Sequence, residues 1–294
     1  MTVARLMKVC FHNRAGESTL EHNWMMRKKI VMTLLMAVAL MMFCLPASAE
    51  AREIRLIVAL SGYAMQDDAI VPVLQKYLRP TDYLIGWGGR RLTMSFLSRF
   101  PQVRKAMGIA TARDLDKLVT QHIPELPYAL DMLYYDPEHW EQTPVEEQQR
   151  VPETLSGVAQ RVRQAGYRVG FAPDRRFTLE LYQKINWSEV DLFVFQTQRV
   201  VRTEADLPAF HEMVNRVVSF IHSRNPRTEI YVQLAFRFAE PALMKHAIDL
   251  ALTTPIHGFS LLYLLNKDCP TQCTVQNLEQ VLAHVSHIET QSSP

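Results

Sequence analysis

Short apolar runs, rich in branched and aromatic residues, alternate with helical stretches from residue 54 to the end of the chain. Most of these runs are continuously apolar, as is typical of parallel strands that are covered on both faces. Seven strands are predicted, at 54–60, 83–85, 129–135, 168–172, 192–196, 230–235 and 258–264. Strands that alternate with helices in this way predict an α/β protein with a parallel sheet.

The intervening helices begin and end at recognisable residues. Thr143-Pro144-Val145-Glu146 has the pattern of a capping box with proline at the first helical position. A helix that restarts at Pro152 is expected to end at Gly166, and another covers about 207–223. Further helices are predicted near 69–77, 112–121, 242–252 and 275–287.

This order of elements predicts a single (β/α)8-type TIM barrel over residues 50–294. The eighth strand is not visible in the pattern, so either it lies in the irregular region 90–125 or the barrel is incomplete or distorted. An open doubly wound sheet is the alternative fold. The run Gly86-Trp87-Gly88-Gly89 lacks the spacing of a dinucleotide-binding turn, and no P-loop is present, so no cofactor is expected.

Residues 25–49 have the three parts of a secretory signal. A basic stretch at 25–29 precedes an uncharged apolar run at 30–45, and Ala47-Ser48-Ala49 fits a signal-peptidase site. The run is shorter than the roughly 20 residues that a membrane span needs. We expect cleavage before Glu50, a secreted or periplasmic bacterial protein, and no stable membrane span afterwards. An uncleaved N-terminal anchor is the alternative, and residues 1–24 are interpreted as an over-extension from an upstream start codon.

Composition places the chain among ordinary folded proteins, with 48% hydrophobic and 21% charged residues. The formal net charge is +2, but residues 1–49 hold six Lys or Arg and two acidic residues. The remainder therefore carries 26 basic and 28 acidic residues. A mildly acidic body lacks the electrostatic footprint of a nucleic-acid-binding protein, so no such partner is expected.

Two cysteines remain after the predicted cleavage, Cys269 and Cys273 in Cys-Pro-Thr-Gln-Cys. In an oxidising compartment, a pair that closes a tight loop favours a disulfide, with two free thiols as the alternative. A lone pair without a second Cys or His pair nearby does not predict a zinc site.

Polar and aromatic residues gather just after the predicted strands, where the active sites of barrels lie. The densest group is Tyr135-Asp136-Pro137-Glu138-His139-Trp140. Pro137 favours an extended Asp136, so Asp136 and Glu138 are expected to project to one side. Two carboxylates that close repel when both are charged, which raises one pKa toward the range of a general acid.

Two other interpretations of this group stay open. In the first interpretation, Asp136 caps a turn, Glu138 is solvated and Trp140 packs beneath the following helix. In the second, Asp136, Glu138 and His139 bind a divalent metal ion. No second histidine-bearing strand end supports the metal, so no metal site is predicted.

Other strand ends supply further candidates. Asp174 is the expected second carboxylate across the barrel mouth, unless it forms an ion pair with Arg175 or Arg176. Aromatic rings that could stack on a sugar, and polar groups that could bind hydroxyls or an acidic sugar group, are Trp87, Tyr135, Trp140, Gln196, Gln198, Gln233 and Arg237.

Three segments carry a resemblance: 131–148, 166–174 and 195–198. They contain a Tyr-Asp-x-Glu-x-Trp strand end, a Thr-Pro-x-Glu helix start, an Ala-Pro strand end and a Gln-x-Gln strand end. This pattern, over about half of the predicted mature chain, resembles a group of secreted bacterial (β/α)-barrel proteins of unassigned function. The architecture is more distantly similar to glycoside-hydrolase barrels of the chitinase-like kind. The Asp-x-x-Asp-x-Asp-x-Glu run of chitinases is absent, and only Asp136-Pro137-Glu138 matches its end.

Together these features predict a secreted or periplasmic barrel that acts on a carbohydrate. As a glycoside hydrolase it would use Glu138 as the general acid and Asp136 or Asp174 as the second carboxylate. The alternative is a non-catalytic protein that binds glycans or has a structural role in the cell envelope. The separation of facing carboxylates should distinguish these functions, because retaining and inverting enzymes need different distances, and a protein without a facing pair is expected to bind only.

Overall fold

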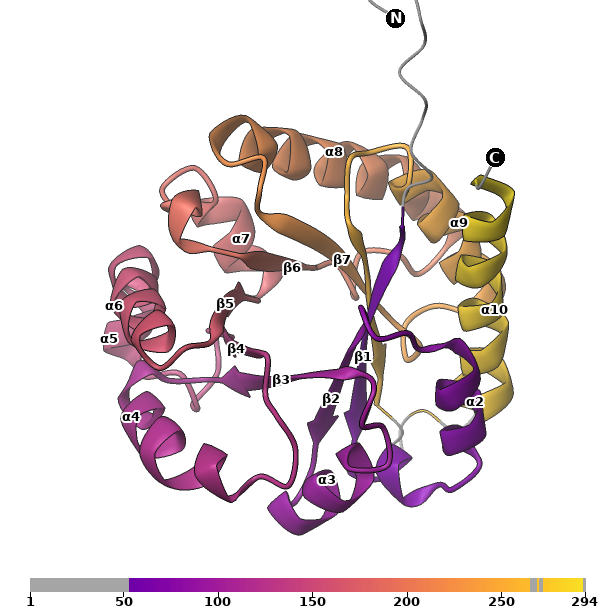
Figure 1. Ribbon diagram of the computed structural model, residues 1–294. Helices are drawn as coiled ribbons and strands as arrows, with labels where there is room; N and C mark the ends of the chain where they lie inside the picture. The colour runs from indigo at the N-terminus through magenta and orange to yellow at the C-terminus, as the bar shows by residue number, and fades with distance from the viewer. Residues whose placement is uncertain (1–52, 265–268, 270–271, 293–294) are drawn as a thin grey trace, which may run out of the picture. The chain divides into compact units, whose positions relative to one another are not determined.

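The computed structural model describes residues 53–264, 269 and 272–292. Within these residues eight parallel strands close into a barrel in chain order, and the last strand pairs with the first (Figure 1). The strands are β1 (Arg55–Ser61), β2 (Tyr83–Trp87), β3 (Arg104–Ile109), β4 (Met132–Tyr135), β5 (Arg168–Phe171), β6 (Leu192–Gln196), β7 (Glu229–Ala235) and β8 (Gly258–Tyr263). The predicted TIM barrel is therefore confirmed, and it is complete.

The strand that the sequence pattern did not show is β3, which lies inside the irregular region. Its first two residues are Arg104 and Lys105, so it does not read as an apolar run. Lys105 is nevertheless buried, because its Nζ donates to the carbonyl oxygens of Phe100 and Val103. The hydrophobic pattern therefore does not reveal this strand, because one of its buried residues is a lysine that donates to backbone carbonyls.

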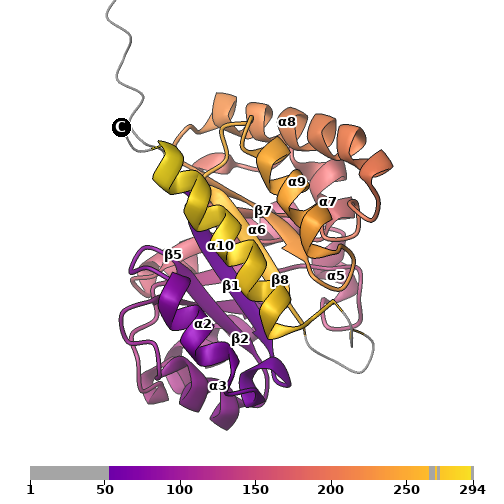
Figure 2. The same cartoon turned by 90° about the vertical axis from the view of Figure 1, so that its right-hand side faces the viewer.

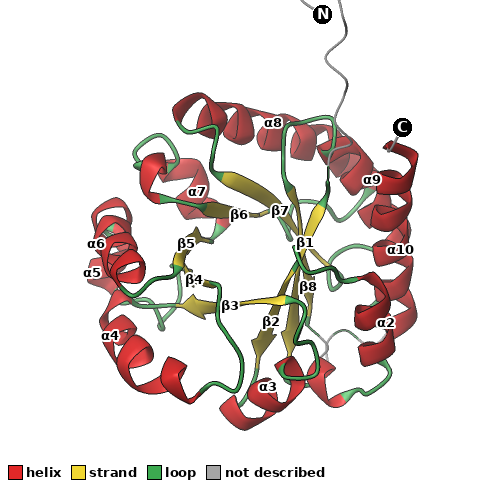
Figure 3. Cartoon of the chain, viewed as in Figure 1, coloured by secondary structure: helices red, strands yellow, loops and turns green. Residues whose placement is uncertain are grey.

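Helices surround the strands on the outside of the barrel (Figure 3). The α-helices are α2 (Ile70–Tyr77), α3 (Arg90–Leu97), α4 (Leu115–Lys117), α5 (Val145–Gln148), α6 (Val151–Gln164), α7 (Arg175–Leu181), α8 (Leu207–Arg224), α9 (Pro241–Ala251) and α10 (Val275–Ser292). Short helical turns are η2 (Ala64–Gln66), η3 (Ala112–Asp114), η4 (Leu118–His122), η5 (Ile123–Glu125), η6 (Trp187–Glu189) and η7 (Glu204–Asp206). The sequence pattern missed α3 and α7, which both begin with two arginines directly after a strand end.

The structure confirms the predicted end of α6 but not the predicted start of α5. Gly166 follows α6 with a positive φ of 86°, a conformation that glycine adopts without a steric penalty. The capping box at Thr143 is wrong, because the residue before α5 is Pro144 and no side chain caps the helix. The Thr143 hydroxyl is used elsewhere, in the loop that carries Glu138.

Two apolar layers form the core, and the alternation of side chains along each strand separates them. On β4, Met132 and Tyr134 face the barrel interior, whereas Leu133 and Tyr135 pack between the strands and the helices. A residue that lies two positions after Tyr134, in a continuation of β4, is therefore expected to point toward the barrel axis.

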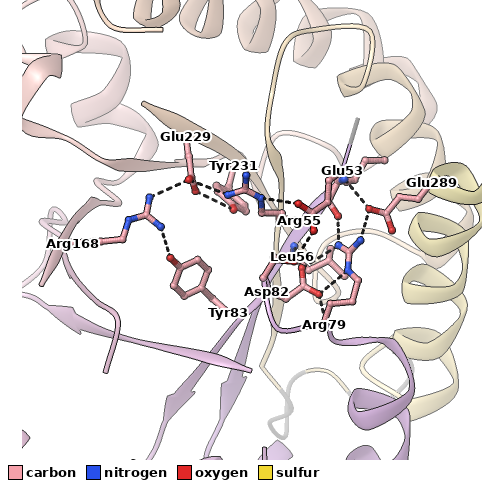
Figure 4. A network of polar contacts seen from close by, with 12 residues as sticks. Glu53, Arg55, Leu56, Arg79, Asp82, Tyr83, Arg168, Glu229, Tyr231 and Glu289 are labelled. Carbon is pink, nitrogen blue, oxygen red and sulfur yellow. Dashed lines mark hydrogen bonds and ion pairs between the residues drawn. The ribbon is translucent and has the colours of Figure 1, made fainter. Parts of the chain in front are cut away.

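A polar network closes the barrel at the amino ends of the strands (Figure 4). Asp82 is fully buried and accepts hydrogen bonds from the backbone N–H groups of Leu56 and Arg79, both at 2.7 Å. The Arg79 side chain pairs with Asp82 and with Glu289 of α10. Figure 2 shows α10 lying alongside α2 and α9, so these contacts fasten the last helix to the start of the barrel.

A second part of the network joins strands that lie further apart. Glu229 on β7 pairs with Arg55 on β1 at 2.9 Å and with Arg168 on β5 at 3.1 Å, and Arg168 also donates to the Tyr83 hydroxyl (Figure 4). These ion pairs connect strands that are not adjacent in the barrel, at the amino ends of the strands.

Cys269 and Cys273 are joined by a disulfide, the pairing that the sequence favours. Both cysteines are buried after β8. Across residues 53–264, 269 and 272–292, no helix has both the length and the hydropathy needed to cross a bilayer. The predicted signal at 25–49 and the segment 1–24 lie outside the described residues.

Candidate functional site

A cavity of about 320 Å³ opens at the carboxyl ends of the barrel strands. Its lining includes eight of the residues that the sequence predicted for the site: Trp87, Asp136, Glu138, Trp140, Gln196, Gln198, Gln233 and Arg237. The volume lies at the lower end of the range found for small-molecule sites. These residues come from β2, β4, β6 and β7 and the loops that follow them, and they meet because every strand of the barrel ends at the same face.

The two carboxylates that follow β4 share one hydrogen-bond donor. Gln196 Nε2 donates to Asp136 Oδ1 at 3.0 Å and to Glu138 Oε1 at 3.3 Å. The same nitrogen donates to the carbonyl of Ala172 at 2.8 Å. Because a carbonyl oxygen can only accept, this contact fixes which end of the amide faces the carboxylates. Asp136 and Glu138 are therefore neighbours on one side of the cavity.

The environment raises the pKa of both carboxyl groups. For Asp136, burial raises the pKa well above its ordinary value, and the charges of Glu138 and Asp174 raise it further. For Glu138, burial is again the largest cause, while the hydrogen bond from Gln196 and the charge of Arg199 oppose it. Asp136 is 5% exposed and Glu138 is only partly buried, so Glu138 is the carboxyl more open to a ligand.

Thr143 organises the loop between these carboxylates and α5. Its Oγ1 accepts from the backbone N–H of Glu138 at 3.2 Å and from the indole Nε1–H of Trp140 at 2.9 Å. The same hydroxyl donates to the carbonyl of Ala110 at 3.1 Å. One buried hydroxyl therefore sets the position of Glu138 and of the Trp140 ring, so Trp140 lines the cavity and does not lie beneath a helix.

Tyr135 does not reach the cavity, and this part of the sequence prediction needs correction. Its side chain is fully buried outside the barrel, and its hydroxyl donates to Glu147 at 3.1 Å. Tyr134 lines the cavity in its place, with its ring edge-to-face against Trp87 at 6.3 Å between centroids. The alternation of the strand already contained this signal, since Tyr134 and Asp136 are two residues apart and Tyr135 is not in phase with them.

Two glycines make room for the Tyr134 ring inside the barrel. A Cβ at Gly108 on β3 would lie 2.8 Å from the Tyr134 hydroxyl, and one at Gly170 on β5 would lie 2.4 Å from the Tyr134 Cβ. Any larger residue at either position would collide with the tyrosine. The neighbouring strands are thus matched to a large side chain at this point of the cavity wall.

Asp174 lies outside the cavity lining and does not serve as a facing carboxylate. Its Oδ1 accepts from the backbone N–H of Phe177 at the start of α7, and its Oδ2 contacts His139. Neither of the two arrangements expected from the sequence, a partner across the mouth or an ion pair with Arg175 or Arg176, matches this geometry. Within the described residues, the carboxylates that line the cavity are Asp136 and Glu138.

No group of three or more His, Cys, Asp or Glu side chains in the described part of the chain is arranged to hold a metal ion. The ring of His139 contacts Asp174 through Nδ1 and stacks on Phe177, with 3.7 Å between ring centroids. It is not part of the cavity lining with Asp136 and Glu138. The geometry therefore does not support the divalent-metal interpretation of these three residues.

The structure adds residues that the sequence prediction did not select. Arg199 and Phe238 line the mouth of the cavity, and Ser260 lines it from β8. Gln233, which the sequence named together with Gln196, Gln198 and Arg237, donates through Nε2 to the Ser260 hydroxyl at 3.4 Å. The sequence could have indicated Arg199, Phe238 and Ser260 only through their position near or just after the end of a strand, and many polar residues outside the cavity have such a position.

No family model matches the chain, and no curated protein matches it. Among solved structures, the catalytic domain of a family GH18 chitinase from the fern Peteris ryukyuensis is similar to 78% of this chain and 98% of its own, with 11% identity and a TM-score of 0.52. The GH18 chitinase ChiB from the chitin utilization locus of Flavobacterium johnsoniae covers 80% of this chain and 95% of its own, with 10% identity and a TM-score of 0.51.

A zinc-bound amidohydrolase from Burkholderia multivorans is similar to the same extent, covering 82% of this chain and 93% of its own, with 13% identity and a TM-score of 0.51. Proteins of different activities thus match equally well, and identities this low show the fold alone. The chain therefore has the barrel architecture of these chitinases, and proteins of other activities share it.

Proposed function

We propose that the cavity binds a carbohydrate and that Glu138 acts as a general acid in cleaving a glycosidic bond. The observation that carries this proposal is the pair Asp136 and Glu138, which share the Gln196 amide nitrogen and whose pKa values are both raised. A carboxyl group that keeps its proton at higher pH than usual is what general acid catalysis of glycoside cleavage needs.

The aromatic residues around the carboxylates support a sugar as the ligand. The rings of Trp87 and Trp140 line the cavity, and Trp87 is 39% exposed. A large ring that remains open to solvent beside two carboxyl groups offers a flat apolar face to a sugar ring. Two of the similar structures are chitinases by name, which is compatible with this substrate class.

In the proposed reaction Glu138 gives its proton to the glycosidic oxygen as the bond from that oxygen to the anomeric carbon breaks. Water then adds its oxygen to the anomeric carbon, and the proton released from that water returns to the Glu138 carboxylate. Asp136 lies deeper and shares the Gln196 donor, so its role is to accept a hydrogen bond from the substrate or to stabilise positive charge on the sugar ring.

The layout of the carboxylates differs from that of enzymes in which two carboxylates flank the scissile bond, about 5–5.5 Å apart for retention or about 6.5–9.5 Å for inversion. Asp136 and Glu138 stand side by side on one strand end, and Asp174 is not available across the mouth. Any attacking group other than water would therefore come from the substrate. The same observation favours a second candidate, a barrel that binds glycans without cleaving them.

A hydrolysis screen on a panel of oligosaccharides, run beside a glycan array, separates the two candidates. We expect Glu138→Gln to lower turnover by about 10²–10⁴-fold while glycan binding is retained. Glu141→Gln is the matched control, because Glu141 is exposed on the same loop and does not line the cavity. If Glu138→Gln hydrolyses as fast as the parent, the catalytic role is wrong. Binding without hydrolysis by the parent would favour the second candidate.

We also propose that the chain is exported and cleaved before Glu50, on the basis of the signal pattern at 25–49. The Cys269–Cys273 disulfide supports this proposal, since disulfides persist mainly in oxidising compartments. The intact mass of protein recovered from the exported fraction should correspond to a chain that begins at Glu50. A product that retains residues 25–49 would contradict it.

A further inference from the structure

We propose that the sugar bound in the cavity carries an anionic group, and that Arg199 and Arg237 bind this group at the mouth. This inference rests on the carbohydrate function proposed above and specifies its substrate class. It begins from an asymmetry of the cavity wall, which has carboxyl groups after β4 and guanidinium groups after β6 and β7.

The two arginines share one aromatic support. The guanidinium groups of Arg199 and Arg237 each lie 5.8 Å from the centroid of the Phe238 ring. Both line the cavity, and Phe238 lines it with them. Each guanidinium group thus brings planar N–H donors to the cavity lining, and donors of this kind suit the oxygens of carboxylate, phosphate or sulfate.

The charges in the cavity also favour an anion. Arginine keeps its charge over the whole accessible pH range, whereas the raised pKa values of Asp136 and Glu138 leave these groups neutral at higher pH than usual. Over that pH interval the carboxyl groups that line the cavity do not balance the charge of Arg199. Within the described residues Arg199 forms no ion pair, although its charge lowers the pKa of Glu138.

Unsatisfied acceptors inside the cavity fit the neutral part of such a sugar. Within the described residues, the side-chain oxygens of Gln198 and Gln233 are buried and have no hydrogen-bond partner. Gln233 is only 9% exposed, and it lies in the cavity lining. Reversing either amide would exchange its oxygen and nitrogen, and one polar end would still lack a partner. Hydroxyl groups of a sugar would satisfy these ends, with the anionic group held at the mouth.

The arrangement has a consequence for catalysis. An anion on Arg199 would offset the charge that lowers the pKa of Glu138. Binding of the correct substrate would therefore help Glu138 to keep the proton that it must donate. A neutral sugar would leave the arginine charge in place and would lack this effect.

Binding of matched saccharides by the purified protein tests the inference. The probes are a neutral oligosaccharide ending in glucose and its counterparts ending in glucuronate, glucose 6-phosphate or glucose 6-sulfate, each titrated by calorimetry. We expect at least one anionic probe to bind about tenfold or more tightly than the neutral one. The tightest of the three arms identifies whether the group is a carboxylate, a phosphate or a sulfate.

Three variants locate the effect. Arg199→Gln and Arg237→Gln should each weaken the anionic probe about tenfold and change the neutral probe less than about threefold. Arg202→Gln is the matched control, because Arg202 lies 5.9 Å from the same Phe238 ring but does not line the cavity, and it should bind like the parent.

Several results would overturn the inference. They are equal binding of neutral and anionic probes, no binding of either, a preference that survives in the Arg199→Gln/Arg237→Gln double variant, or an equal loss in Arg202→Gln. Hydrolysis of neutral saccharides without an anionic preference would remove this inference and leave the proposed function standing. Preferential binding of an anionic probe without hydrolysis would support this inference and contradict the catalytic role of Glu138.

Discussion

The backbone N–H and the ring nitrogen Nδ1 of His139 both contact a single oxygen of Asp174, Oδ2, at 2.8 and 2.6 Å. The other oxygen of Asp174 accepts from the backbone N–H of Phe177. One carboxylate therefore ties the loop after β4 to the start of α7. Because His139 follows Glu138 directly, this link positions the candidate acid without entering the cavity.

Replacing Asp174 should cost stability. Asp174→Ala removes a helix cap and the contacts with His139, and we expect the free energy of unfolding to fall by about 1–3 kcal/mol, since a cap alone contributes about 0.5–2 kcal/mol. Urea denaturation measures the change. Glu180→Ala is the control on the same helix, because its ion pair with Arg176 is exposed and should contribute less than about 1 kcal/mol. Equal effects of the two variants would contradict this role for Asp174.

Activity should depend on pH through Glu138. A general acid must carry its proton, so kcat/KM should fall as pH rises through the pKa of Glu138, which burial holds above its ordinary value. Arg199 lowers this pKa, so Arg199→Gln should move the alkaline limb of the profile to higher pH, by up to about one unit. Arg202→Gln should leave the limb unchanged. An unchanged limb in Arg199→Gln would show that the arginine does not act on this group, and a shift to lower pH would contradict the sign of its effect.

Asp136→Asn should stabilise the protein at neutral pH. The pKa of Asp136 is raised in the folded state, so the stability that it contributes is fully present below its unfolded value near 3.8 and is lost as pH rises through the folded value. Asparagine does not ionise and can still accept the hydrogen bond from Gln196. We expect about 0.5–2 kcal/mol of added stability at pH 7 and a difference that vanishes below about pH 4. Chemical denaturation at both pH values measures it, and a variant less stable than the parent at pH 7 would contradict the burial argument.

Gly170→Ala should destabilise the barrel. The added Cβ would lie 2.4 Å from the Cβ and 3.1 Å from the Cα of Tyr134, and backbone atoms of a buried strand cannot move aside cheaply. We expect a loss of about 1–3 kcal/mol, typical of overpacking in a core. Gly157→Ala in α6 is the control, since nothing lies within 4 Å of its Cβ, and it should add about 0.5–1 kcal/mol. Thermal unfolding of both variants tests the contrast, and a Gly170→Ala protein as stable as its parent would show that the strands can separate.

The sequence predicted the barrel because parallel strands covered on both faces require runs of apolar residues, and such runs are legible without knowledge of contacts. It missed β3, since a strand that begins with Arg104 and Lys105 lacks an apolar run, and the sequence does not show that the carbonyls of Phe100 and Val103 accept from the buried Lys105. It identified Asp136 and Glu138 as a pair because a spacing of two places side chains of a strand on one face.

The predicted pair Asp136 and Glu138 already implied Tyr134 by its phase along the strand, but the sequence alone did not determine that this face of β4, and not that of Tyr135, meets the cavity. That choice depends on the register of β4 against β3 and β5, where Gly108 and Gly170 leave room for only one of the two rings. The hydrogen-bond partner of Asp174 was likewise not visible in the sequence, because Asp174 contacts His139, which is 35 positions away along the chain. Local patterns fix the elements and the phase of their side chains. Contacts between distant segments decide which carboxyl groups remain open to a ligand, because only the closed barrel brings competing hydrogen-bond partners within reach.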